Sequence, residues 1–590
     1  MKAVPSSFKD SKAFLPTNNS FEFLVYSLSI GTFSFFILLL SLTHLGFKLS
    51  FSAGLLSSLF FSSLIYKVFF LKQDLFTTNS SSDKNFFYLP ALLIIFYAGY
   101  LILIKSIFYF PSWDHFTYWL VDAKEIFIHD HLRTTAEINN YFNYTSFLPL
   151  QFSLLYQLLG SIKEEATGIF SVIYLSLSSM LVLSVNKVQT FKTNFILSLL
   201  CILIFSCFWN LSVVSYAEAF TAFCFTLFFR FLINDSPQFD VAKKITFLIS
   251  LLIGIGFIKG PFKIYSIFLL LFLIVYYARE IKKIKKKSFL YLLIPVLILI
   301  SQLYYRLYVW REHIEIPLVD ERRLLLGTIS ERLQYILDTF AFLFKNHPVM
   351  SVLYLFVILY ALMKIKNWKQ NSKSSIALIS ALILFPGINI GYYILEMTSH
   401  QSQSLSRYVT PTFFVLGLFF ANEFSQKISS WGKKTTIFVT LILSLLIHKE
   451  VLRTHHHIKN FDFHDWKASS NKTLEPMSSA ALKAATLLPQ NARLLFVGDI
   501  DTSISNMGFS SLIQRYLLLP NSVGGLYRVP IDKFSDKLFT AKPDFLYLTD
   551  FTQDGPTLKF LNLNLSNEHS YLVKIESFSP LKLGAITELN

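Results

Sequence analysis

The sequence predicts an all-α polytopic membrane domain with a small α/β domain at its C-terminal end. Of the 590 residues, 53% are hydrophobic and only 15% are charged, and the mean hydropathy is +0.49. A soluble domain normally carries about a quarter charged residues, and a disordered chain combines low hydrophobicity with high net charge. The composition therefore excludes a soluble globular enzyme and a disordered protein, and it predicts many apolar segments rather than one anchor.

The charge is unevenly distributed between the two domains. The formal net charge is +16, yet residues 454–590 hold 13 basic and 13 acidic residues, so the whole excess lies in residues 1–453. Basic charge concentrated among apolar runs indicates membrane topology rather than nucleic-acid binding. All three cysteines lie in apolar stretches and none lies in the C-terminal domain, so neither a disulfide framework nor a cysteine-based metal site is predicted.

About thirteen apolar runs are candidate spans in a membrane domain at 21–453. The tail at 1–20 carries three lysines and is expected to be cytoplasmic, and the first run is too long for a cleaved signal peptide. Basic residues recur at every second turn, most densely in REIKKIKKK at 279–287, which predicts a cytoplasmic N-terminus and an extracytoplasmic C-terminal domain. The runs cover about 21–43, 51–71, 86–109, 164–185, 194–213, 217–233, 245–258, 262–279, 288–309, 347–366, 374–395, 408–424 and 435–452.

Two longer loops, 110–165 and 310–346, are predicted to face outward. The first holds seven acids and three bases, as the charge rule expects of an outer loop. Within it, FLPLQFSLLYQLLG at 147–160 is apolar but only 14 residues long, so we interpret it as an interfacial or re-entrant helix rather than a span.

The C-terminal domain, 454–590, has the pattern of a small α/β fold. ARLLFVGD at 492–499 and DFLYLTD at 544–550 predict buried strands, and 505–518 has a helical pattern. The run His455–His457, just before it, could bind a metal, but we interpret it as a solvated linker.

Two carboxylates at the outer edges of spans are candidates for chemistry, because ionisable groups at membrane depth are costly. Asp114, in PSWDHFTYW, follows the third run at an aromatic boundary. It could cap a helix that begins at His115, or desolvation could raise its pKa to suit a general base. Glu218, in SYAEAF, lies in a tight apolar hairpin, where it could also satisfy the donors at a helix start.

Two cations lie on the same predicted side. Lys259, in FIKGPFK, either extends to the interface or pairs with a phosphate. Arg407, in SRYVTP, offers a planar fork for phosphate oxygens, with an ion pair to Glu396 as the structural alternative.

In this order, these motifs resemble the GT-C superfamily of polyprenyl-phosphate-sugar-dependent glycosyltransferases, in its protein-mannosyltransferase and lipid A aminoarabinose-transferase-like branch. The resemblance spans most of 86–452 and rests on an outer-loop Asp, a proline-containing approach to a helix, a Tyr-Ala-acid hairpin and an Arg-Tyr-x-x-Pro helix start. Here these are Asp114, 141–160 (YFNYTSFLPLQFSLLYQLLG), Tyr216-Ala217-Glu218, and Arg407 and Tyr408 with Pro411. The chain departs from the family in having His115 where a second acid is common, a single Pro149 in place of a double proline, and an extra early span.

The resemblance implies an inverting transfer of a sugar from a polyprenyl-phosphate donor to an acceptor on the periplasmic or lumenal face. It assigns Asp114 as the general base and Arg407 and Lys259 to the donor phosphate. It gives Glu218, Tyr216, Tyr408, His115 and Glu396 supporting or acceptor-side roles. The expected partners are the lipid-linked sugar, membrane lipid and a glycan, lipid or protein acceptor, but no nucleic acid. No cofactor is predicted, with a divalent metal left open. The expected location is a bacterial inner membrane.

Three other function classes stay open at this stage. One is another lipid-handling enzyme or a polymerase. A transporter or flippase of a lipid-linked or anionic substrate would also place charges at membrane depth. A non-catalytic receptor would keep the fold and bind through the outer domain. The sequence names neither the sugar nor the acceptor.

Overall fold

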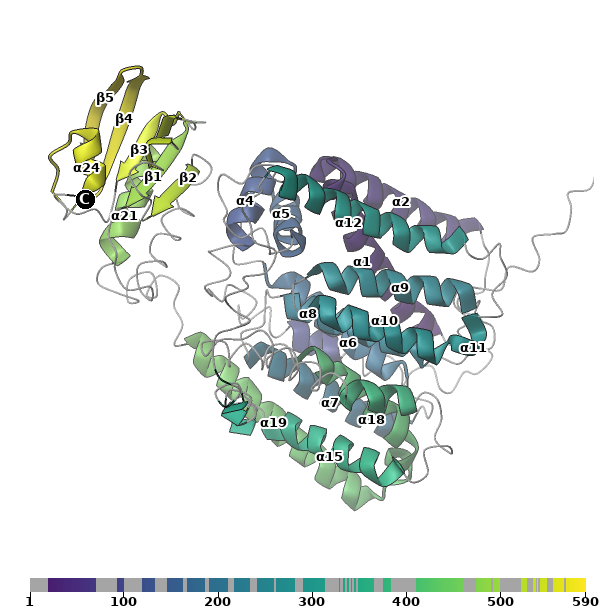
Figure 1. Cartoon of the computed structure of the whole chain (residues 1–590). Helices are drawn as coiled ribbons and strands as arrows, with labels where there is room; N and C mark the ends of the chain where they lie inside the picture. Colours follow the sequence, from purple (N-terminus) through teal and green to yellow (C-terminus); the bar gives the residue numbers. More distant parts are fainter. Residues whose placement is uncertain are drawn as a thin grey trace, which may run out of the picture.

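The computed structural model describes most of the helical domain and part of the C-terminal domain (Figure 1). The described residues are 20–70, 93–99, 119–132, 146–162, 167–185, 190–210, 217–233, 241–258, 262–281, 290–312, 375–383, 410–459, 474–489, 492–498, 522–527, 555–566 and 569–589, and, with short gaps, 328–365 and 534–548. The helices of the first domain are α1 (Ser20–His44), α2 (Leu49–Phe70), α4 (Leu120–His129), α5 (Phe147–Leu159), α6 (Ile169–Leu183), α7 (Phe191–Asn210), α8 (Ala217–Leu232), α9 (Val241–Ile258), α10 (Phe262–Tyr276), α11 (Ala278–Ile281), α12 (Leu293–Glu312), α15 (Pro348–Ile365), the 3-10 turn η7 (Thr410–Thr412), α18 (Phe413–Ser430) and α19 (Lys433–Lys459).

Helix α8 forms the centre of the helical bundle. Every residue from Ala217 to Leu232 is buried, as expected for a helix that is apolar on all sides. It packs against α6, α9, α18 and η7, while α7 lies against α6, α18 and α19. The predicted helical fold class is therefore confirmed.

One end of the bundle is held by contacts between α1, α2, α4, α5 and α12. The backbone N–H of Leu49 donates to the carbonyl of Asp130 at 2.8 Å. The ring of His44 stacks on that of Tyr305, with centroids 4.2 Å apart. The predicted topology places His44, Leu49 and Asp130 outside the membrane and Tyr305 near the outer end of a span, so we call this the outer end.

Contacts at the opposite end join residues that the prediction places at the cytoplasmic ends of spans or in cytoplasmic turns. Arg230 donates to both the hydroxyl and the carbonyl oxygen of Ser184, each at 2.9 Å, and lies over the ring of Tyr26 at 5.0 Å. Lys192 donates to the carbonyl of Trp431 at 2.6 Å. Each contact pairs residues of the same predicted side, which supports the alternating path of the chain. Which end faces the cytoplasm stays a prediction.

Three described helices are long and apolar enough to cross a membrane by length and composition, within Val25–His44, Val241–Ile258 and Lys433–Arg453. Several other helices, among them α6 and α10, are apolar but shorter. The expected number of about thirteen spans therefore stays a prediction.

Two predicted segments differ in detail from the structure. Helix α5 ends at Leu159 and is buried along Phe147–Tyr156; it packs against α4, α2, α1 and α9, so it is an internal helix of the bundle rather than one lying along an exposed surface. Helix α19 continues to Lys459, so His455–His457, which we interpret from the sequence as a solvated linker, belong to a helix.

The C-terminal part is a three-layer α/β domain. Its sheet has the order β2-β1-β3-β4-β5, with β1 parallel to β2 and β3, and with β4 antiparallel to β3 and β5. Alternate side chains of β1 enter different cores, since Leu495 packs towards α24 and Leu494 towards α21. The elements are α21 (Leu474–Leu487), β1 (Leu494–Gly498), β2 (Ser522–Tyr527), β3 (Phe545–Leu548), α24 (Pro556–Leu561), β4 (Tyr571–Phe578) and β5 (Leu581–Glu588).

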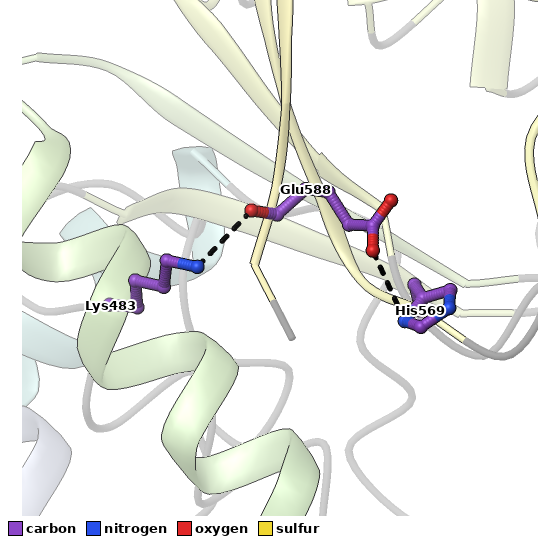
Figure 2. Close-up of polar contacts among 3 residues, drawn as sticks. All are labelled: Lys483, His569 and Glu588. Atoms are coloured by element: carbon purple, nitrogen blue, oxygen red, sulfur yellow. Dashed lines mark hydrogen bonds and ion pairs between the residues drawn. The ribbon is translucent and has the colours of Figure 1, made fainter.

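The predicted α/β class of this domain is confirmed, and β1 and β3 are the two strands that the sequence predicts. The predicted helix at 505–518 lies outside the described residues. The end of β5 is fixed from two sides, as Figure 2 shows: Lys483 of α21 donates to the carbonyl of Glu588 at 3.4 Å, and the carboxylate of Glu588 lies 3.5 Å from His569.

Asp130, the C-cap residue of α4, also caps the N-terminus of α2 through its side chain. Its carboxylate accepts from the backbone N–H of Ser50 at 2.8 Å, from the Ser50 hydroxyl, and from the Gln157 amide at 2.7 Å. Desolvation raises the pKa of Asp130, but these hydrogen bonds and the charge of Lys48 outweigh it and lower the pKa below 3.8. A lowered folded-state pKa gives stability that is present above the unfolded-state pKa and lost as pH falls through the folded-state value.

Replacing this cap is expected to loosen the start of α2. In Asp130→Ala, amide hydrogen exchange over 45–55 should accelerate by roughly two- to thirtyfold, because losing an N-cap costs about 0.5–2 kcal/mol. The difference from wild type should shrink as pH falls below about 4, where the carboxylate of the opened state takes up a proton, and should vanish below the lowered folded-state pKa. Exchange over 428–436, at the other end of the bundle, is the internal control; unchanged exchange at 45–55 would show that the cap is dispensable.

The assignment of the two ends can be tested by cysteine labelling. Phe47, in the turn between α1 and α2, is 45% exposed, and Lys434 is exposed at the start of α19. An impermeant maleimide should label Phe47→Cys in intact cells and Lys434→Cys only after permeabilisation. The native Cys201, Cys207 and Cys224 are buried and should not react. The reverse labelling pattern would invert the topology.

Candidate active site at the outer end of the bundle

Glu218 is the one predicted site residue that the structure describes. Asp114, His115, Tyr216, Lys259, Glu396, Arg407 and Tyr408 lie outside the described residues. The site can therefore be examined through Glu218 and through the described segments that flank the other motifs.

Glu218 lies in the first turn of α8, and its side chain is completely buried. A negative charge at a helix N-terminus is favoured by the helix dipole, which explains how a carboxylate is tolerated beside Ala219 and Phe220. Its burial excludes an idle surface charge. Capping of α8 and a role in chemistry both remain compatible with this position.

The turn that follows Arg407 packs directly on α8. Thr410, Pro411 and Thr412 form η7, are all buried, and contact both α8 and α18. The start of α18 therefore lies beside α8. This brings the chain to within three residues of Arg407 beside the helix that carries Glu218.

The segment at 141–160 reaches the same place through α5. The ring of Phe147, the first residue of α5, lies 4.4 Å from that of Phe220, two residues after Glu218. Helix α4, which follows the Asp114 motif, packs on α5, where the Ser153 hydroxyl donates to the carbonyl of Ala123 at 2.5 Å. Trp119, the first described residue after Asp114, is buried.

The residues on either side of the Lys259 turn also belong to the central bundle. Ile258 ends α9 and Phe262 begins α10, and both are buried. Helix α9 packs on α8, and Tyr265 of α10 lies 5.7 Å from Phe225 of α8. The flanks of all four motifs are thus connected through α8, which supports a common site without placing the undescribed side chains.

Sequence reasoning missed several buried polar residues near this end. Lys124 and Glu125 of α4 are 9% and 5% exposed, although they belong to a polar loop. Gln151 of α5 and Tyr174 of α6 form a buried hydrogen bond of 2.6 Å. Charged residues in an acidic loop, and a neutral amide within an apolar run, do not stand out in the sequence. Only the packing of the helices shows that these residues are buried. Among the described residues, no group of three or more His, Cys, Asp or Glu side chains could hold a metal ion.

Comparison with known proteins gives a limited result. No family model and no curated protein matches the chain. Two solved structures are similar to it, both of ArnT from Cupriavidus metallidurans. The form bound to undecaprenyl phosphate has 11% identity and a TM-score of 0.48, covering 82% of this chain and 96% of that one. The apo form has 12% identity and a TM-score of 0.45, covering 80% and 95%. With TM-scores below 0.5, neither similarity by itself decides the fold or activity of this chain.

Because Glu218 is buried, the stability of the protein should depend on the shape of the side chain at this position. Glu218→Gln preserves the volume and should unfold within about 2 °C of wild type, whereas Glu218→Ala should lose about 1–3 kcal/mol, because buried donors near the helix start lose their acceptor. Thermal unfolding in detergent measures both. Asp338→Asn is the matched control, since Asp338 is exposed. Equal stability of Glu218→Ala and wild type would show that no buried donor depends on this carboxylate.

Proposed function

We propose that the protein is a membrane glycosyltransferase that moves a sugar from a polyprenyl-phosphate donor to an acceptor on the outer face of a bacterial inner membrane. The observation that carries the proposal is the complete burial of Glu218 in the first turn of α8, the helix on which described segments next to the other motifs pack, directly or through a neighbouring helix. We take these contacts as support for one site formed by residues from distant parts of the chain.

The proposed reaction is an inverting displacement at the anomeric carbon. Asp114 takes the proton from the acceptor hydroxyl, and that oxygen forms a bond to the anomeric carbon as the bond to the donor phosphate oxygen breaks. Polyprenyl phosphate leaves with the electron pair, and the acceptor gains the sugar. Arg407 and Lys259 stabilise the charge that develops on the leaving phosphate. Glu218 orients the acceptor or holds Lys259, with Tyr216, Tyr408, His115 and Glu396 as supporting residues.

The proposal includes no metal-dependent step. Among the described residues, no group of three or more His, Cys, Asp or Glu side chains could hold a metal ion, and the divalent metal that the sequence leaves open has no role in the proposed reaction.

The rest of the chain suits a lipid-linked donor. Helices α10 and α12 expose apolar side chains, including Ile267, Leu271, Leu297 and Leu307, and such surfaces are stable in contact with acyl or prenyl chains. The C-terminal domain, which has its own cores on both faces of its sheet, is proposed to shape the acceptor side. Its extracytoplasmic location follows from the predicted topology.

Asp114→Asn separates an enzyme from the alternatives. Purified protein in nanodiscs would be incubated with radiolabelled polyprenyl-phosphate sugars and a cell-envelope extract. Wild type should transfer label and release polyprenyl phosphate. Asp114→Asn should bind the donor equally but lose at least about a hundredfold in rate, as general-base catalysis contributes roughly 10²–10⁴-fold.

Asp338→Asn, in the other outer loop, is the matched control and should keep full activity. Neither binding nor release with any donor in wild type would contradict the proposal and favour a transporter or flippase. Binding with equal turnover in Asp114→Asn would remove Asp114 from the reaction.

A further inference from the structure

A polar pair lies inside the aromatic core at the outer half of the bundle. Gln151 of α5 is 1% exposed and Tyr174 of α6 is also 1% exposed. The amide nitrogen of Gln151 donates to the phenol oxygen of Tyr174 at 2.6 Å. Both residues come from predominantly apolar helices, so neither is required for the burial of its helix.

This pair retains unused hydrogen-bonding capacity. Gln151 Oε1 is buried and has no hydrogen-bond partner within the part of the chain that the structure describes. The phenol oxygen of Tyr174 accepts from the amide, so its own proton is available to another acceptor. If the amide were turned round, Oε1 would take the phenol proton and Nε2 would be left over. A buried polar atom without a partner costs free energy, so packing alone gives no reason to keep one here.

The pair lies one layer beneath Glu218. The ring of Tyr174 is 4.8 Å from Phe220 and 5.8 Å from Phe223, on the first two turns of α8. Phe220 also contacts Phe147, which begins α5. Glu218 precedes Phe220 by two residues on the same helix. The pair therefore faces the interior of the bundle just below the proposed reaction centre.

Resting on the proposed function, we propose that Gln151 and Tyr174 bind a hydroxyl group of the donor's sugar. One hydroxyl can donate to Gln151 Oε1 and accept from the Tyr174 phenol, which uses both free positions of the pair. Aromatic walls with a few fixed polar groups are typical of small-molecule sites, and Phe147, Phe170 and Phe220 supply such walls. Because the pair is buried, the ring of Phe220 must turn aside when the sugar enters.

The depth of the pair favours the donor over the acceptor. The sugar of a lipid-linked donor is tethered at the membrane surface and can enter between the helices, whereas a periplasmic acceptor approaches from the aqueous side. An interhelical clamp between α5 and α6 is the competing role. A clamp would be satisfied by the Gln151–Tyr174 hydrogen bond alone and would show no preference among ligands.

The test compares binding of undecaprenyl phosphate with that of undecaprenyl phosphate carrying a hexose or an aminopentose, using protein in nanodiscs. The measured quantity is the ratio of the two dissociation constants, which isolates the sugar from the lipid. In wild type, one glycosylated lipid should bind at least about tenfold more tightly than the bare lipid. Gln151→Leu and Tyr174→Phe should each reduce that ratio by about tenfold, the loss expected of a buried hydrogen bond.

Ser153→Ala is the matched control, because it removes another buried hydrogen bond from α5 and should leave the ratio unchanged. Tyr174→Phe removes only the hydroxyl and keeps the contacts of the ring, so it still tests the inference if Gln151→Leu does not fold. A ratio within about twofold of wild type in both variants, or no preference for any glycosylated lipid in wild type, would overturn the inference. If the preference for a glycosylated lipid depends on Gln151 but no sugar is transferred, the proposed function is refuted and the binding role of the pair stands. If sugar is transferred but the variants keep the wild-type preference, the proposed function stands and the binding role of the pair is refuted.

Discussion

The complete burial of α8 is the constraint on which the rest of the helical domain depends. A helix buried on every side from Ala217 to Leu232 must be surrounded, and α6, α9, α18 and η7 do so. Its two charged residues mark its ends: Arg230 is held by Ser184 at one end, and Glu218 lies in the first turn at the other. Since a charge inside an apolar bundle is costly unless it is compensated, these residues fix the direction of α8. The neighbours of α8 then determine which motifs meet at each end.

Hydropathy predicted much of this arrangement because a membrane span carries its signal in its own sequence. The run 217–233 corresponds closely to α8, and the basic turns predicted which ends lie together. In the C-terminal domain, 492–499 and 544–550 were found because β1 and β3 are continuous apolar runs buried in the sheet. Strand β2 contains Gly524 and Gly525, and β5 is a largely exposed edge strand, so neither has the pattern of a buried strand. The burial of α5 depends on partners contributed by distant segments, which a local pattern does not reveal.

The residues of the candidate site also divide into those that the sequence identifies and those that only the structure identifies. Glu218 was identified because an ionisable residue among apolar ones is conspicuous, and its burial agrees with that reasoning. Gln151 was not identified, since a neutral amide in FLPLQF changes the hydropathy little and its significance arises only from its hydrogen bond to Tyr174. A charged residue among apolar ones can therefore be identified from sequence, whereas a neutral residue in a buried hydrogen bond is recognised only once the helices are packed.

The buried hydroxyl groups argue for chemistry at one end of the bundle rather than passage through it. A transporter needs polar groups along its path to replace the hydration of its substrate. In the described helices, many buried hydroxyls bond instead to carbonyls four residues earlier in their own helix, as do those of Ser178, Ser179, Ser198, Thr221, Thr226 and Ser250. Such bonds satisfy the hydroxyl locally and leave less capacity for a substrate. At the inner end, Arg230 and Lys192 are likewise occupied by contacts between helices. Gln151 Oε1 is among the buried polar atoms that no described residue satisfies. Its partner Tyr174 lies against Phe220, two residues after Glu218, as expected if a lipid-linked substrate enters and leaves at the outer face.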